Sequence, residues 1–284
     1  MQILLIITAV LFVIVALFFI VLHLGFRAPR VIETQTPKDF DIDFEEVSIP
    51  TVSNKKLFGW LLPVENSNKT LIILHGWGGN AEMMLPIALP FYQAGYNILL
   101  IDSRSHGKSD SDTFSSLPRF AEDTDKAIDW LKKNHPKRCE KTALLGHSVG
   151  AGAVLFSASK RNDVDAIISI SAFAHAQWMM QRYLARFHLP QFLINLILNY
   201  VQWLIGLRFA DFAPLSTVCS INTPVLIVHG KEDTVIPIED ARAILKHCPE
   251  SHLTLLEVDD AGHESVDKFE EHSDKLVAFL QHAM

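Results

Sequence analysis

The sequence predicts an α/β protein in which a mostly parallel sheet is covered by helices on both faces. Three observations support this prediction. Short apolar runs alternate with amphipathic stretches from about residue 70 to the end of the chain. About 245 residues follow an apolar N-terminal segment, a normal length for one α/β domain. The chain shows no internal repeat, no low-complexity tract and no sign of a second domain.

The first segment is long and apolar enough to cross a bilayer. Between Ile3 and Leu24 there is no formal charge, and at 1.5 Å per residue the run covers about 30 Å of hydrocarbon. A cleaved signal peptide is the alternative. Against it, no Lys or Arg precedes the run, the run is long for a signal peptide, and no small-residue cleavage site stands out. We predict a transmembrane anchor over 1–26 and a linker over 27–41.

The positive residues near this segment predict its orientation as a single-pass anchor. Arg27, Arg30 and Lys38 follow the span and none precedes it, which places the rest of the chain on the cytoplasmic side. The cysteines agree with this, because they show neither close pairing nor metal-ligand spacing and so resemble reduced thiols. They are Cys139, Cys219 and Cys248.

The remaining elements form one domain over 42–284. Continuous apolar runs predict strands buried on both faces, and amphipathic stretches of ten or more residues predict the helices between them. The expected order is two antiparallel strands at 43–49 and 56–63, strand 70–75, helix 80–94, strand 97–102, helix 118–134, strand 141–146, helix 149–160, strand 164–171, an insertion over 173–214, strand 224–230, helix 238–247, strand 252–258 and helix 265–282.

Ser148 occupies the most informative position in the chain. It lies in Gly146-His147-Ser148-Val149-Gly150, between an apolar strand and a helix start rich in small residues. A strand that enters a helix through Gly-x-Ser-x-Gly forces the serine into a tight, strained turn, which flanking glycines permit. The hydroxyl then stands clear of the sheet, where a base and a substrate can reach it. The pattern predicts a nucleophilic serine.

An acid and a histidine follow in the order that such a serine requires. Asp233 comes after the predicted strand 224–230, and His263 comes after the strand 252–258. Loops at the carboxyl ends of parallel strands gather at one rim, so both can reach Ser148. A serine hydroxyl needs a base to remove its proton, and the base needs a carboxylate to hold its tautomer. Glu232 is the main rival of Asp233 for the acid role.

At this point the chain resembles the α/β-hydrolase superfamily, with serine esterases and lipases as the nearest pattern, over about residues 40–284. The segment 71–80 is similar to the family's strand and oxyanion loop, and 102–109 is similar to the loop after the next strand. The resemblance implies an α/β-hydrolase fold with a helical cap insertion, and it favours Asp233 over Glu232. It also implies an oxyanion hole built from the backbone N–H groups of Val149 and Trp77.

Two departures from the family pattern stand out. Ser105 occupies a position where the family often has glycine, and the oxyanion loop is not the triple-glycine version of many lipases. Other histidines near the site are interpreted as structural: His75 as a brace of the oxyanion loop, His106 as a loop-packing residue, and His147 as the variable position of the serine turn.

The insertion over 173–214 is expected to carry the substrate preference. It is rich in large apolar residues, and Pro190 divides it into two helices. We expect these helices to form a cap that lines an acyl-binding pocket, although most of their apolar residues will pack the cap onto the core. Because the second helix is apolar nearly all round, we hypothesise that the cap lies near the bilayer, with Arg182, Arg186 and Arg208 meeting headgroups.

These observations predict a membrane-anchored serine hydrolase that cleaves carboxylic esters of lipid-like or medium to long acyl chains through Ser148, His263 and Asp233. No metal or organic cofactor is expected, and the net charge of −7 argues against a nucleic-acid partner. A serine nucleophile also argues against dehalogenase or epoxide-hydrolase chemistry. Serine aminopeptidase and thioesterase activities are alternatives, and so is a non-catalytic, membrane-tethered binding protein. The sequence leaves the oligomeric state open.

Overall fold

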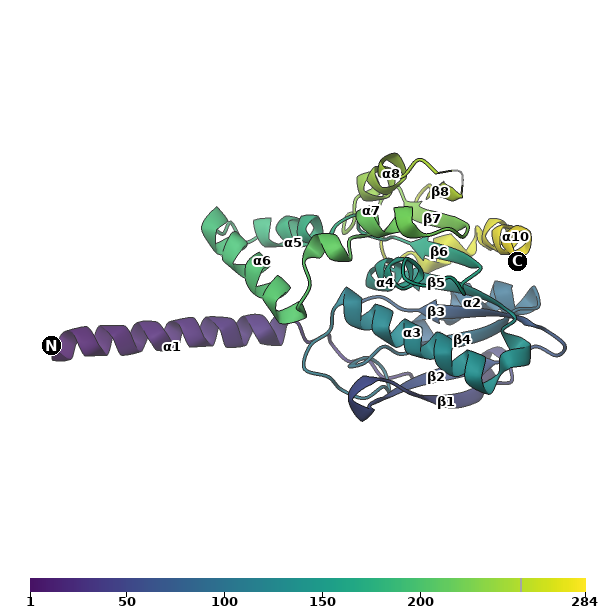
Figure 1. Ribbon diagram of the computed structural model, residues 1–284, viewed down its shortest axis with the longest axis horizontal. Helices are drawn as coiled ribbons and strands as arrows, with labels where there is room; N and C mark the ends of the chain where they lie inside the picture. Colours follow the sequence, from purple (N-terminus) through teal and green to yellow (C-terminus); the bar gives the residue numbers. More distant parts are fainter. Residues whose placement is uncertain (251) are drawn as a thin grey trace.

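The computed structural model describes residues 1–250 and 252–284, and its centre is one twisted eight-stranded sheet (Figure 1). The strand order is β1-β2-β4-β3-β5-β6-β7-β8. β2 pairs antiparallel with both β1 and β4, and the pairs from β4 to β8 are parallel. The strands are β1 Glu45–Pro50, β2 Lys56–Leu62, β3 Lys69–Leu74, β4 Asn97–Ile101, β5 Lys141–His147, β6 Ala166–Ile170, β7 Val225–Gly230 and β8 Leu253–Val258.

Helices cover both faces of this sheet, as the sequence predicts. Alternate residues of β3 show why: Ile72 and Leu74 join the core on one face, and Leu71 and Ile73 join the core on the other. α3, α4 and α8 pack on the first face, and α2, α9 and α10 pack on the second. The helices are α1 Gln2–Gly25, α2 Leu85–Gln93, α3 Leu117–Asn134, α4 Val149–Ala158, α5 Ala176–Ala185, α6 Gln191–Ile205, α7 Pro214–Thr217, α8 Ile238–His247, α9 Val266–Glu270 and α10 Ser273–Ala283.

Two predicted helices differ from those in the structure. The helix expected over 80–94 begins as a 3-10 turn, and α2 itself starts only at Leu85, with Pro86 in its first turn. The helix expected over 265–282 is wrong as a single element. His272 leaves the helical conformation (φ −106°, ψ 15°), its amide donates to the Phe269 carbonyl, and the chain forms two short helices, α9 and α10.

The insertion forms two helices, α5 and α6, and Pro190 is the residue that precedes α6. One side of α6 packs on the core through Ile194, Ile197, Leu198 and Val201. The hypothesis that Arg182 faces lipid headgroups is wrong. Its guanidinium donates two hydrogen bonds, of 3.0 and 2.8 Å, to the two carboxylate oxygens of the buried Asp240 on α8, so Arg182 attaches the cap to the domain.

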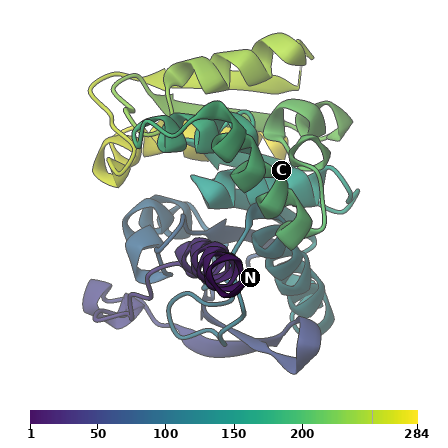
Figure 2. The ribbon, with the colours of Figure 1, turned by 90° about the vertical axis from the view of Figure 1, so that its left-hand side faces the viewer.

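α1 projects from the domain on the side of the cap (Figure 1). It has 24 residues and a mean hydropathy of 3.4, none of its side chains is buried, and it is long and apolar enough to cross a membrane. Its last turns touch the cap: the rings of Phe19 and Tyr200 are 4.9 Å apart, and Phe18 and Leu22 are partly buried against the core that includes α6. Figure 2, which looks along α1, shows the cap helices beside it.

The segment after α1, residues 26–34, lies against two loops at the carboxyl ends of β3 and β4. The carbonyl of Phe26 accepts from the Ser115 amide at 3.0 Å, and Arg30 donates to the Gly107 carbonyl at 3.2 Å. The Val31 carbonyl accepts from the Asn80 side chain at 3.1 Å. We call this segment the strap, because it is attached along its length. The strap thus connects the apolar helix to the loop 76–82.

Two further contacts of the strap reach the same loop. Thr34 donates to the Glu82 carboxylate through its amide at 2.5 Å and through its hydroxyl at 3.0 Å. Pro29 packs on Gly78, where φ is +73° and an added Cβ would lie 2.9 Å from the proline ring. A side chain at position 78 would therefore disturb both the turn and the strap.

Glu33 of the strap forms a buried carboxyl pair with Asp102, which follows β4. The Asp102 oxygens accept from the Ala81 and Lys108 amides, both at 2.8 Å, while in the described part of the chain no group donates to Glu33. Burial and the neighbouring Glu33 carboxyl together raise the pKa of Asp102 to about 8. The Asp102 carboxyl therefore keeps its proton at neutral pH.

This pair predicts a pH-dependent contribution to stability. Between about pH 4 and pH 8 the folded state binds a proton that the unfolded state has lost, so the free energy of unfolding falls as the pH rises, by at most about 1.4 kcal/mol per pH unit. Glu33→Gln replaces the neighbouring carboxyl with an amide that can donate to an ionised Asp102, so it is expected to lower the pKa of Asp102 and flatten this slope. Denaturant titrations of the wild-type chain and the variant at several pH values would measure the difference.

The matched control is Glu65→Gln, since Glu65 is an exposed carboxylate outside the strap. It is expected to leave the slope unchanged. Parallel stability curves for wild type and Glu33→Gln from pH 5 to pH 8 would contradict an effect of Glu33 on the pKa of Asp102.

Candidate active site

The turn between β5 and α4 holds Ser148 in a strained conformation. Ser148 has φ +55° and ψ −117°, a region that L-residues rarely adopt. The flanking glycines allow it: a Cβ at Gly146 would lie 2.3 Å from the Gly150 carbonyl oxygen, and a Cβ at Gly150 would lie 2.4 Å from the His75 carbonyl oxygen. The two glycines of Gly-x-Ser-x-Gly are therefore needed because the end of β5, the start of α4 and the loop after β3 approach one another closely.

The structure brings the predicted serine, histidine and acid together. Ser148 Oγ donates to His263 Nε2 at 2.9 Å, and His263 Nδ1 donates to Asp233 Oδ2 at 2.7 Å. Asp233 lies on the loop after β7 and His263 lies on the loop after β8, as the strand order requires. Glu232, the rival acid, is exposed, and its amide only donates to the Ala261 carbonyl. Asp233 is the acid that contacts His263.

Asp233 is held as an ionised carboxylate. Its second oxygen, Oδ1, accepts from the amides of Val235 at 2.9 Å and Ile236 at 2.7 Å. Burial raises the pKa of Asp233, but the hydrogen bonds from His263 and Ile236 outweigh burial and keep the pKa below its ordinary value. An ionised Asp233 favours the His263 tautomer with its proton on Nδ1, which leaves Nε2 free to accept from Ser148.

Two other histidines support these residues, and the sequence analysis missed their roles. His147 Nε2 donates to the His263 carbonyl at 2.9 Å, so the variable position of the serine turn fixes the backbone of the histidine loop. His229 at the end of β7 donates to the Ile236 carbonyl at 2.8 Å and lies 3.5 Å from Asp233 Oδ2. Both contacts join loops that are distant in sequence, and no local pattern signals them.

The predicted donors of the oxyanion hole are the backbone N–H groups of Trp77 and Val149. Val149 is the first residue of α4, so its N–H has no partner within the helix. Trp77 lies in a turn that the Gly79 amide closes on the Gly76 carbonyl at 3.2 Å, and such a turn leaves the N–H of its second residue unused. Over residues 1–250 and 252–284, neither amide donates to another protein group.

His75 and His106 act as supports below this loop. His75 donates from Nδ1 to the Gly76 carbonyl and accepts from the Ser103 amide at Nε2, at 2.6 and 3.0 Å. Burial, together with nearby His106, lowers the pKa of His75 to about 3, and burial lowers the pKa of His106 to about 4. Both rings are therefore neutral near pH 7, as expected for bracing and packing residues.

Ser105 takes the conformation that glycine would take at this position. Its φ is +70°, and its hydroxyl accepts from the Asp112 amide at 2.7 Å while its own amide donates to the Asp110 carbonyl at 2.9 Å. The departure from the family pattern thus keeps the turn and adds side-chain hydrogen bonds that stabilise it.

A cavity of about 200 Å³ opens beside Ser148. Its walls come from the loop after β3 and from the residue after the histidine, and none of the described wall residues belongs to α5 or α6. The expectation that the cap lines this pocket is therefore wrong, because the apolar side chains of the cap pack onto the core or point outward. The wall residues are His75, Gly76, Trp77, Gly78, Gly79, Met83, Met84, Ser148 and Glu264.

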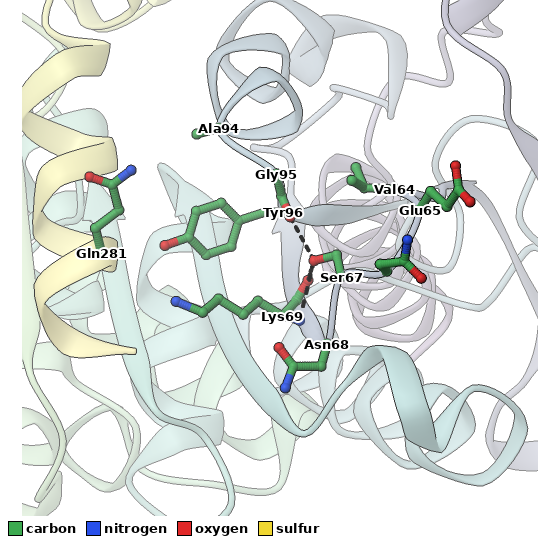
Figure 3. A pocket seen from close by; sticks show the side chains of 10 residues that line it. Val64, Glu65, Ser67, Asn68, Lys69, Ala94, Gly95, Tyr96 and Gln281 are labelled. Carbon is green, nitrogen blue, oxygen red and sulfur yellow. Dashed lines mark hydrogen bonds between the residues drawn. The ribbon is translucent and has the colours of Figure 1, made fainter.

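A larger cavity, of about 360 Å³, lies elsewhere and does not belong to this site (Figure 3). It is lined by residues 64–69, by 94–96 and by Gln281, near the amino-terminal ends of β3 and β4. Ser148 follows the carboxyl-terminal end of β5, at the opposite edge of the parallel strands.

Among the residues that the structure describes, no group of three His, Cys, Asp or Glu side chains could hold a metal ion.

Known proteins share this fold and about a quarter of the aligned residues. An esterase of Pyrococcus furiosus superimposes with a TM-score of 0.76 and 27% identity, covering 91% of this chain and 98% of the esterase. YqkD, an uncharacterised protein of Bacillus subtilis, is 27% identical over 75% of this chain and 73% of its own length. An uncharacterised membrane protein of Saccharomyces cerevisiae is 28% identical over 78% of this chain and 74% of its own length.

The family model described as "Serine aminopeptidase, S33" matches residues 65–216, which is more than half of the chain and includes the turn at Ser148. The matched region runs from just before β3 to α7. An α/β hydrolase of Penicillium shares the fold, with a TM-score of 0.66 and 22% identity over 86% of this chain and 99% of that protein. The chain therefore belongs to the S33 serine aminopeptidase family of α/β hydrolases.

Proposed function

We propose that this hydrolase cleaves carboxylic esters through Ser148, His263 and Asp233. The observation that carries the proposal is the unbroken series of hydrogen bonds from Ser148 Oγ through His263 to Asp233, beside a cavity that can admit a substrate. The similarity to an archaeal esterase supports an ester as the substrate class. We expect neither a metal nor an organic cofactor to take part.

The geometry suggests the following reaction. His263 Nε2 takes the hydroxyl proton while Ser148 Oγ attacks the ester carbonyl carbon, and Asp233 stabilises the imidazolium that forms. The same proton passes to the leaving alcohol, which departs and leaves an acyl-enzyme. His263 then removes a proton from a water molecule, the water attacks the acyl carbonyl, and the acid is released as Ser148 regains its proton.

The amides of Val149 and Trp77 are proposed to stabilise the oxyanion of both tetrahedral intermediates. Val149 stands at the N-terminus of α4, where the helix dipole favours a negative charge. Trp77 lies in the turn at the mouth of the cavity. The loss of one such donor would cost about 2.7–4 kcal/mol of transition-state stabilisation.

The acyl group is proposed to enter the cavity beside Trp77, Met83 and Met84. Methionine and tryptophan side chains provide an adaptable apolar wall. At about 200 Å³ the cavity is smaller than the 300–1,000 Å³ that is typical of pockets for drug-sized ligands. A medium or long chain would therefore lie only partly inside and extend outward along the domain.

The first prediction concerns the nucleophile. Detergent-solubilised wild-type protein is expected to hydrolyse p-nitrophenyl esters, with the highest kcat/KM at medium or long chains, and Ser148→Ala is expected to lower kcat by at least about a thousandfold. A fluorophosphonate should label the wild-type protein and not the variant. Ser216→Ala, which changes an exposed serine on α7, is the control and should behave as wild type.

If the fluorophosphonate labels the wild-type protein but no ester is hydrolysed, thioesters or peptides would become the preferred substrate classes. A folded wild-type protein that neither turns over esters nor reacts with the fluorophosphonate would contradict the proposal, and it would favour a membrane-tethered binding protein.

An aminopeptidase is the second candidate, because one carboxylate stands in the cavity wall. Such an enzyme needs an acidic group to bind the substrate's free amine, and exposed Glu264 lines the cavity with Ser148. The description of the family model supports the same candidate. Among the described residues, no carboxylate of the cap lines the cavity, so Glu264 would have to bind the amine alone. We therefore rank esters first.

The two candidates predict opposite preferences. If esters are the substrates, kcat/KM for p-nitrophenyl octanoate should exceed that for alanine p-nitroanilide by at least about a hundredfold. If Glu264 binds an amine, the anilide is the better substrate, and Glu264→Gln lowers its kcat/KM by about 10–100-fold through the loss of a charged hydrogen bond. Glu232→Gln, at a nearby exposed acid outside the cavity wall, is the matched control.

We also propose that α1 anchors the protein as a single span with the hydrolase on the cytoplasmic side, where the positive residues after α1 belong. Cys219 is exposed, whereas Cys139 and Cys248 are buried. A membrane-impermeant maleimide added to intact cells is therefore expected to label the chain only after permeabilisation, with a Cys219→Ser variant as the control. Labelling of Cys219 in intact cells would place the domain on the other side.

A further inference from the structure

The outer face of α6 carries large apolar side chains that the described part of the chain leaves uncovered. Phe192, Leu196 and Trp203 recur at spacings of four and seven residues, so they share one face of the helix. Phe192 is 73% exposed and Trp203 is 75% exposed. The inner face is already buried in the core, so these side chains are not needed to attach the cap.

The end of α5 and the residues after it carry two further exposed aromatic side chains. Tyr183 and the following Phe187 are exposed, and their rings pack edge to face at 5.5 Å. Arg186 and Arg208 are exposed close to these aromatic residues in the sequence, and within residues 1–250 and 252–284 neither side chain forms an ion pair. We name the five residues Tyr183, Phe187, Phe192, Leu196 and Trp203 the outer cap face.

The outer cap face is continuous with the apolar helix α1. The ring of Phe19 lies 4.9 Å from the ring of Tyr200, and the ring of Tyr200 lies 5.8 Å from that of Trp203. Figures 1 and 2 both show one end of α6 beside the domain end of α1. Any molecules that surround α1 near Phe19 would therefore also contact Trp203.

The length of α1 sets the depth of this contact. At 1.5 Å per residue, Phe19 lies about 9 Å before Gly25, the end of the helix. About 20 residues are enough to cross the hydrocarbon, so the last turn of this 24-residue helix reaches the interfacial region. Aromatic residues are enriched at that level, with basic side chains near the headgroups. Four of the five residues of the outer cap face are aromatic, and Arg186 and Arg208 lie close to them in the sequence.

We propose that the outer cap face lies in the membrane interface and is a second lipid-binding element beside α1. Its partner is a bilayer surface, with acyl chains against the aromatic residues and headgroup phosphates near Arg186 and Arg208. Continuity with α1 makes the bilayer the occupant, because a second copy of the chain would have to displace lipid from the same level. Resting on the proposed function, a bilayer ester would then enter the site beside the strap, where Pro29 packs on the cavity residue Gly78, without crossing bulk water.

Tryptophan quenching in vesicles tests the contact without reference to catalysis. The full-length chain is reconstituted in vesicles of phosphatidylcholine and phosphatidylglycerol, with or without brominated acyl chains. Brominated lipid is expected to quench part of the wild-type fluorescence, and Trp203→Phe should remove at least half of the quenchable part. Trp130→Phe, at a part-buried tryptophan on α3 remote from α1, is the matched control and should retain it.

Equal quenching of Trp203→Phe and wild type by brominated lipid, with acrylamide in the water quenching Trp203, would overturn the proposal. A Trp203→Asp substitution that converts a dimer in detergent to a monomer, together with an absence of lipid quenching, would assign the face to a second copy of the chain and also overturn it.

The consequence for substrates has its own measurement. Phe192→Gln combined with Trp203→Gln changes exposed side chains, and it should lower hydrolysis of a vesicle-embedded ester about tenfold while a water-soluble short-chain ester is hydrolysed at the wild-type rate. An equal loss on both esters would contradict entry from the bilayer. If wild type hydrolyses neither ester, the proposed function fails, while the quenching result still decides the membrane contact.

Discussion

The close approach of the backbone at the turn between β5 and α4 is the constraint on which the rest of the structure depends. Gly146, Gly150 and the His75 carbonyl come so near that no side chain fits between them. This contact draws the loop after β3 against the start of α4, and it forces Ser148 to a positive φ. The same close packing therefore positions both the serine hydroxyl and the free amides around it. α4 is buried along its whole length, which keeps this turn in place.

Hydrogen bonds between loops that are distant in the sequence stabilise the strained turn at Ser148 and the residues around it. His147 holds the backbone of His263, His229 holds the loop that carries Asp233, and His75 holds the carbonyl of Gly76. Each of the three rings makes its contact as a neutral donor, and burial lowers the pKa of each. Because these rings are neutral, they support His263 and Asp233 without adding a positive charge that would compete for the Asp233 carboxylate.

Periodicity and the positions where parallel strands end were sufficient to predict the sheet, its covering helices and the contact of Ser148 with His263. The choice of Asp233 as the acid came from the resemblance to the α/β hydrolases. It did not predict the pairs Glu33–Asp102 and Arg182–Asp240, since each joins residues about 60 or more positions apart through side chains with no repeating pattern. It also misjudged the cap. Apolar composition is the same for a pocket lining, a core contact and an outward face, and only the packing of α5 and α6 distinguishes them.

The strap between α1 and the domain has a consequence for how substrates are encountered. A domain on a long free linker can turn toward the bulk solution or toward a neighbouring membrane. Residues 26–34 are instead hydrogen-bonded to the loops that frame Ser148, so once α1 is in a bilayer the mouth of the site keeps a fixed height and heading above it. For a substrate in the same leaflet, the search would then be two-dimensional: surface density and lateral diffusion would set the encounter rate, rather than the concentration in the surrounding volume.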